Sequence, residues 1–122
     1  MKKVLRIKDN REFQAIIQTR QFVSSSCFSV YYVDKKESVS RVGISAPTKL
    51  GNAVVRNKVK RQVRMMIQEI SPFKEDFDSI IIVKKPYLNN SYQENYDELN
   101  SNYKKVIMKR KRKHEGVSNE SI

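Results

Sequence analysis

The feature that most constrains the fold is a short, unbroken apolar run, Ser-Ile-Ile-Ile-Val, at residues 79–83. A run of this length that is rich in β-branched residues is typical of a buried strand. Residues 27–33 and residues 41–46 instead alternate apolar with other side chains, as strands with two different faces do. We therefore predict a sheet in which residues 79–83 form a central strand and the other two runs pair beside it.

Three helices are predicted around these strands. The first covers residues 9–20, where apolar side chains recur on one face. The second begins after a cap residue, Asn52, and ends near Ile70, just before a Ser-Pro pair. The third opens with a capping box, in which Ser91 and Glu94 satisfy each other's backbone N–H groups.

The order of these elements is helix, strand, strand, helix, strand, helix, with a further short strand expected in the 20s. This order predicts an α+β fold, a single small domain in which helices pack on a mixed sheet as a two-layer sandwich. The path from the second strand through the second helix to the third strand is a candidate βαβ unit. The sequence does not reveal the hand of that crossover.

Net charge restricts the class of partner. Of the 122 residues, 25 are Lys or Arg and 13 are Asp or Glu, so the formal net charge is +12. A charge of this size favours a polyanionic partner, either a nucleic acid or an anionic membrane surface. No apolar run approaches the ~20 residues of a membrane span, and the opening MKKVLRIKDN lacks the apolar segment of a signal peptide. We therefore expect a soluble, cytoplasmic protein.

The chain is poor in metal-binding and redox-active side chains. It contains one cysteine, Cys27, and one histidine, His114. A structural zinc site needs about four such ligands, so neither that site nor an internal disulfide is expected. A nuclease with its own two-metal site needs clustered carboxylates. The densest acidic group is Glu75, Asp76 and Asp78, which we interpret as a solvated turn.

Cations are concentrated on the second predicted helix. Residues 38–68 include seven basic and no acidic side chains. At 100° per residue, the apolar side chains of this helix fall within an arc about 120° wide, and a polar and cationic set faces the other way over about 100°. That set is Asn57, Lys60, Arg61, Arg64 and Gln68. Like charges four residues apart destabilise a helix unless phosphates supply the counter-charge, so we interpret this face as binding nucleic acid.

Two other features have two readings each. The basic cluster of Lys104, Lys105 and residues 109–113 can contact phosphates or can keep a tail soluble, and residues 109–122 are predicted to be a disordered tail. Phe13 and Tyr31 can stack on unpaired bases or belong to the core.

Residues 51–64, Gly-Asn-Ala-Val-Val-Arg-Asn-Lys-Val-Lys-Arg-Gln-Val-Arg, closely resemble the signature of the bacterial ribonuclease P protein family. That signature reads Gly-Asn-Ala-Val-x-Arg-Asn, followed by Lys-Arg and then Arg. The agreement extends over residues 6–108, and the predicted elements come in the family's order. Composition alone would also allow a structural RNA-binding protein, such as a ribosomal one, and the motif decides between them. A DNA-reading helix is less favoured because this one is cationic along its length.

The resemblance implies a domain over residues 1–108 that is similar to a ribosomal-protein domain, with a left-handed βαβ crossover. It implies a protein that is inactive alone and binds a large catalytic RNA, which holds the active-site Mg²⁺. The complex would remove the 5′ leader of precursor tRNA, with no organic cofactor, membrane or obligate protein partner. The expected RNA-binding residues are Lys49, Arg56, Asn57, Lys58, Lys60, Arg61 and Arg64. The expected leader cleft consists of Phe13, Ile17 and Tyr31.

Three positions depart from the family pattern. Lys58 stands where arginine is common, Thr48 removes a cation from the loop before the basic helix, and Ile17 stands where an aromatic residue is frequent. The last two departures concern the way the leader is bound.

Overall fold

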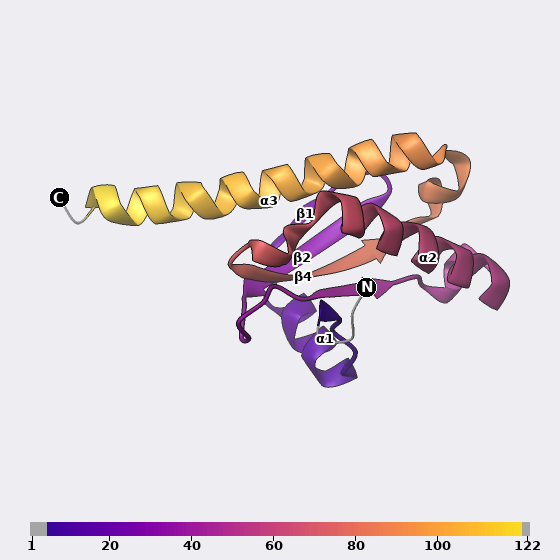
Figure 1. The fold of residues 1–122 in the computed structure, drawn as a ribbon, viewed down its shortest axis with the longest axis horizontal. Helices are drawn as coiled ribbons and strands as arrows, with labels where there is room; N and C mark the ends of the chain where they lie inside the picture. Colours follow the sequence, from indigo (N-terminus) through magenta and orange to yellow (C-terminus); the bar gives the residue numbers. More distant parts are fainter. Residues whose placement is uncertain (1–4, 121–122) are drawn as a thin grey trace.

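One mixed sheet and three helices make up the fold, in a computed structural model that describes residues 5–120, with side chains to residue 112 (Figure 1). The strands are β1 (Phe22–Ser24), β2 (Phe28–Asp34), β3 (Val42–Ser45) and β4 (Phe77–Val83). The helices are α1 (Asn10–Gln18), α2 (Ala53–Ile70) and α3 (Tyr92–Glu120), with short 3-10 turns η2 (Thr48–Leu50), η3 (Pro72–Lys74) and η4 (Lys85–Asn89). Among the described residues, no helix combines the length and the apolar character needed to cross a membrane.

The predicted central strand is confirmed, since the order of strands is β1-β2-β4-β3. β4 pairs antiparallel with β2, where Val30 lies opposite Ile81, and parallel with β3, where Ile44 lies opposite the same residue. β1 is the short strand expected in the 20s and pairs antiparallel with β2. Because β3 and β4 are parallel and α2 connects them, the predicted βαβ unit is confirmed. The left-handed sense of its crossover, which the resemblance implies, stays a prediction.

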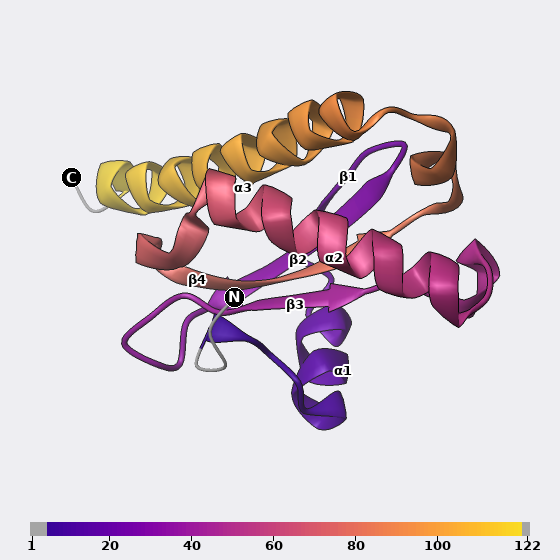
Figure 2. The same cartoon turned by 45° about the vertical axis from the view of Figure 1, so that its right-hand side comes forward.

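The two faces of the sheet carry unequal cores. α2 and α3 lie on one face and α1 on the other (Figure 2). The larger core is formed between the sheet, α2 and α3, and includes Phe28, Val63, Met66, Ile81, Leu99 and Tyr103. The smaller core lies under α1 and consists of Ile7, Ile16 and Ile80, with Phe13 and Tyr31 among the half-buried side chains around it. The main two layers are therefore the sheet and the α2–α3 pair, and α1 covers a small part of the opposite face of the sheet.

The caps predicted at Asn52 and at Ser91 with Glu94 are confirmed, and α1 is capped as well. The side chain of Asp9 caps α1, and the Asn52 side chain accepts a hydrogen bond from the N–H of Val55 at 3.1 Å. In the capping box, the N–H of Glu94 donates to Ser91 Oγ at 3.1 Å, and the N–H of Ser91 donates to Glu94 Oε1 at 2.9 Å. Each cap satisfies N–H groups that the first helical turn leaves without partners.

The C-terminal segment differs from the sequence prediction. We expected the folded domain to end at residue 108 and a disordered tail to follow, whereas α3 continues without a break to Glu120. The run at residues 109–113 consists of lysine and arginine, which are good helix formers, so the helix can continue past residue 108. In addition, Arg110 ties this part of α3 to the sheet, because its guanidinium donates to Asp34 at 2.8 Å and to Asp76 at 3.0 Å.

Candidate nucleic-acid interface

The amphipathic pattern predicted for α2 is present in the structure. Val59, Val63, Met66 and Ile67 are buried against the sheet and α3. The expected RNA-binding residues of this helix stay outside the core. Asn57, Lys58 and Arg61 are exposed along the outer ridge of α2, whereas Arg56, Lys60 and Arg64 are half-buried.

Lys60 and Arg64 are half-buried because they form one wall of a groove. This groove, of about 440 Å³, lies between the N-terminal segment with α1, strand β3 and helix α2. Four cations line it, Arg6 and Lys8 from the N-terminal segment and Lys60 and Arg64 from α2. Phe13 of α1 and residues of β3 lie among the uncharged lining residues, and none of the lining residues carries a carboxylate. The groove therefore offers positive charge and an aromatic ring in one place.

The N-terminal segment reaches the groove by extending the edge of the sheet. Arg6 forms a parallel bridge with Val42 of β3, and the N–H of Ile7 donates to the Val42 carbonyl at 3.1 Å. This pairing places Arg6 and Lys8 in the lining of the groove, together with Lys60 and Arg64 of α2. From the sequence, Arg6 could either contact phosphates or serve as a solubilising charge, and Lys8 was not assigned, because a single bridge leaves no periodic signal.

A glycine in β3 sets how closely α1 approaches the sheet. A Cβ atom placed on Gly43 would lie 2.6 Å from Cε2 of the Phe13 ring, closer than real Cβ atoms come to other atoms. The absence of that atom allows Phe13 to rest directly on β3. The position of Phe13 at the groove therefore depends on Gly43.

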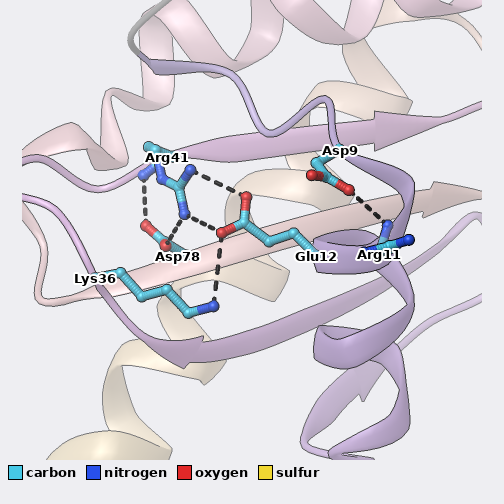
Figure 3. A network of polar contacts seen from close by, with 6 residues as sticks. All are labelled: Asp9, Arg11, Glu12, Lys36, Arg41 and Asp78. Atoms are coloured by element: carbon cyan, nitrogen blue, oxygen red, sulfur yellow. Dashed lines mark hydrogen bonds and ion pairs between the residues drawn. The ribbon is translucent and has the colours of Figure 1, made fainter.

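An ion-pair network fastens α1 to the sheet (Figure 3). The Arg41 guanidinium binds Glu12 of α1 through two hydrogen bonds, of 3.0 Å and 2.7 Å, and binds Asp78 of β4 at 3.0 Å. The backbone N–H of Arg41 also donates to Asp78, at 2.8 Å, and Lys36 lies 3.7 Å from Glu12. The hydrogen bonds from Arg41 hold the pKa of Glu12 below its ordinary value. Because Glu12 precedes Phe13 in the chain, the network also fixes one wall of the groove.

The solvated turn predicted for Glu75, Asp76 and Asp78 was wrong for Asp78. Its side chain is buried within β4, and Arg41 neutralises it. The reason lies in a partner from another strand, which the local sequence does not show. Within the described part of the chain, no three His, Cys, Asp or Glu side chains are grouped as metal ligands.

The residues expected in the leader cleft do not all lie at the groove. Phe13 lines it, whereas Ile17 is half-buried farther along α1 and Tyr31 lies on β2, toward the opposite edge of the sheet. There the Tyr31 ring packs on Phe22 of β1, with 5.0 Å between ring centroids. Phe22 is 40% exposed and was missed, because a strand of three residues gives little alternation to read.

The remaining expected residue of the interface, Lys49, lies in the turn η2 before α2. It is exposed and does not line the groove. The structure thus gathers Phe13, Lys60 and Arg64 into one hollow. It places Asn57, Lys58 and Arg61 on the adjoining ridge.

Comparison with known proteins decides the family. A family model described as Ribonuclease P matches residues 1–107. This chain belongs to the ribonuclease P protein family. Bacterial relatives named ribonuclease P protein component include one from Mesoplasma florum, 46% identical over 96 residues, which covers 77% of this chain and 87% of the relative. Another, from Bacillus cereus, is 42% identical over 118 residues and covers 93% of this chain and all of the relative.

Solved ribonuclease P proteins share the fold. The protein from Staphylococcus aureus matches with a TM-score of 0.75 and 34% identity, over 85% of this chain and 96% of that one. The protein from Thermotoga maritima matches with a TM-score of 0.68 and 25% identity, over 77% of this chain and 90% of that one. The predicted α+β class and the resemblance at residues 51–64 are therefore confirmed. The chain is a ribonuclease P protein component of the bacterial type, part of an endoribonuclease holoenzyme.

Proposed function

We propose that this protein binds the catalytic RNA of ribonuclease P and the 5′ leader of precursor tRNA, and thereby assists removal of the leader. The groove is the observation that carries this proposal. Arg6, Lys8, Lys60 and Arg64 converge on it without a carboxylate in its lining. Single-stranded RNA is bound where cations follow its phosphates and aromatic rings stack on its bases, and Phe13 supplies such a ring.

The open edge of the sheet adds hydrogen-bonding capacity to the groove. Backbone groups along β3 point alternately toward β4 and toward the free edge. On the β4 side, the N–H of Ser79 donates to the Arg41 carbonyl, and on the free side, the N–H of Ile7 donates to the Val42 carbonyl. The next residue that faces outward is Ile44, which lines the groove. Its N–H and C=O can bind the polar edge of an unpaired base.

In this proposal the RNA subunit, and not the protein, catalyses phosphodiester hydrolysis. Glu12 and Asp78 are both engaged by Arg41, and no group of three His, Cys, Asp or Glu side chains among the described residues could hold a metal ion. We therefore assign Mg²⁺ to the RNA subunit. The cations of the groove and of α2 reduce repulsion between the two RNAs, which strengthens binding of the precursor. In this role the protein works in the cytoplasm, needs no membrane and has no obligate protein partner.

The first test is cleavage of a 5′-labelled precursor tRNA at low magnesium, with protein alone, a bacterial ribonuclease P RNA alone, and both. We expect a product with the mature 5′ end only in the mixture. Cleavage by highly purified protein alone would contradict the assignment of catalysis to the RNA. If the protein bound the RNA without stimulating cleavage, a purely structural RNA-binding role would fit better.

A further inference from the structure

α2 has a second hollow on its other flank, here called the apolar notch. The notch has a volume of about 270 Å³ and lies between the N-terminal half of α2 and the turn η4. Its apolar lining comes from Val54, Val55 and Val59 of α2 and from Tyr87 and Leu88 of η4. At 100° per residue, the side chains at the notch and those at the groove point about 170° apart around the helix. The notch is therefore separate from the groove.

The apolar side chains at the rim of the notch are poorly covered. Val54 is 77% exposed and Leu88 is 43% exposed. A single exposed apolar side chain is ordinary. Two that share a hollow provide a surface on which a ligand can bury apolar area.

Polar groups at the notch match the edge of a nucleobase. Tyr87 Oη donates to Gln62 Oε1 at 2.7 Å, and the Gln62 side-chain NH₂ has no hydrogen-bond partner among the described residues. The NH₂ of Asn90 donates to Cys27 Sγ and to Asn95, and its carbonyl oxygen has no partner within the same residues. The notch thus offers one hydrogen-bond donor and one acceptor beside an apolar floor, the combination that recognises an unpaired base.

The surrounding charge selects the same kind of partner. Lys58 stands in the wall of the notch, and none of its lining residues carries a carboxylate. Val54 also shares a helical stripe with Asn57, Lys58 and Arg61, which follow it by three, four and seven residues. RNA phosphates lying along that ridge would bring their bases to the level of the notch.

We propose that the apolar notch takes an unpaired nucleobase of the ribonuclease P RNA whose phosphates contact the ridge of α2. This inference rests on the proposed function and adds a base-binding site to it. A base in an apolar pocket contributes affinity without releasing counterions, whereas a phosphate contact contributes through their release. The two kinds of contact therefore differ in the salt dependence of binding.

The test compares variants of the full-length chain in binding a bacterial ribonuclease P RNA at several salt concentrations. The double variant Val54→Ser/Leu88→Ser should bind about 10-fold more weakly than the unsubstituted protein, with the same slope of log K against log salt. Lys58→Ala should instead lower the slope by about 1. Met65→Ser is the matched control, because Met65 is 56% exposed on the same helix and lies outside the notch. It should change neither quantity.

Base-specific chemical probing of the RNA gives a second, direct measurement. At least one unpaired base should be protected from methylation by the unsubstituted protein and should react again in the complex with Leu88→Ser. Unchanged affinity of the double variant and no base that regains reactivity would overturn the inference, and would favour a protein partner for the notch. Failure of the unsubstituted protein to bind the RNA at all would instead overturn the proposed function.

Discussion

At the scale of the residue, Gly43 and Phe13 decide how closely α1 approaches the sheet. In Gly43→Ala, the new methyl group would lie 2.6 Å from the Phe13 ring, so the ring and α1 must move away. Overpacking of this kind costs about 1–3 kcal/mol of unfolding free energy. Because the move also deforms the groove, we expect affinity for precursor tRNA to fall more than affinity for mature tRNA.

A double-mutant cycle separates this effect from a general loss of stability. In a Phe13→Ala background the methyl group meets no ring, so Gly43→Ala should cost much less. Denaturant unfolding of the four proteins gives the coupling free energy. Additive costs would show that the contact between residues 13 and 43 does not limit the approach of α1.

Two carboxylates make stability depend on pH. Hydrogen bonds from Arg41 lower the pKa of Glu12. Burial raises the pKa of Glu98, but hydrogen bonds from Ser25 and from the backbone N–H of Cys27 outweigh that effect and lower it overall. Since both folded pKa values lie below the ordinary 4.5, both groups stabilise the fold fully above that pH. This stabilisation is lost as the pH falls through the lowered values.

We therefore expect the unfolding free energy to decline more steeply below pH 4.5 in the unsubstituted protein than in Glu12→Gln. Urea denaturation at several pH values between 7 and 3 measures the decline. Glu69→Gln is the control, because Glu69 is exposed on α2 and takes no part in the network of Arg41. Parallel curves for the unsubstituted protein and Glu12→Gln would show that Glu12 gains nothing from Arg41.

At the scale of the element, α2 contributes one wall to the cationic groove and another to the apolar notch. On its groove side, Arg64→Ala removes one cation that we expect to contact an RNA phosphate. The slope of log K against log salt should fall by about 1, with weaker binding at low salt. Gln68→Ala, one turn further along the helix and neutral, should leave the slope unchanged. An unchanged slope in Arg64→Ala would mean that this side chain makes no phosphate contact.

The sequence predicted those parts of α2 and of the sheet that follow from local periodicity. The buried arc of α2, the cap at Asn52 and the buried strand β4 are of this kind. The groove is different, because its walls come from segments that are distant in the chain. They meet through long-range contacts such as the bridge between Arg6 and Val42 and the packing of Phe13 on Gly43. The burial of Asp78 likewise depends on Arg41, 37 residues earlier. Neither leaves a pattern within one element.

At the scale of the whole molecule, the C-terminal part of α3 runs out beyond the sheet (Figure 1). Among the cations at residues 104–112, Arg110 is the half-buried one. It binds Asp34, and its guanidinium carbon lies 5.5 Å from the centre of the Phe77 ring. Lys105, Lys109 and Arg112 are exposed on the same segment. α3 is therefore packed on the sheet through its buried residues and tied to it again at Arg110, while Lys105, Lys109 and Arg112 stay available to a partner.

Because these cations are exposed, substitution can test whether they contact RNA phosphates or only keep this segment soluble. If Lys105, Lys109 and Arg112 contact RNA phosphates, replacing all three with glutamine should lower the salt slope by about 3 and weaken precursor binding. Thermal unfolding should change little, because the three side chains are exposed and glutamine is also a good helix former. A salt slope equal to that of the unsubstituted protein would mean that these cations serve only to keep the helix soluble. In that case the RNA-binding surface would be limited to α2, the groove and the N-terminal segment that lines it.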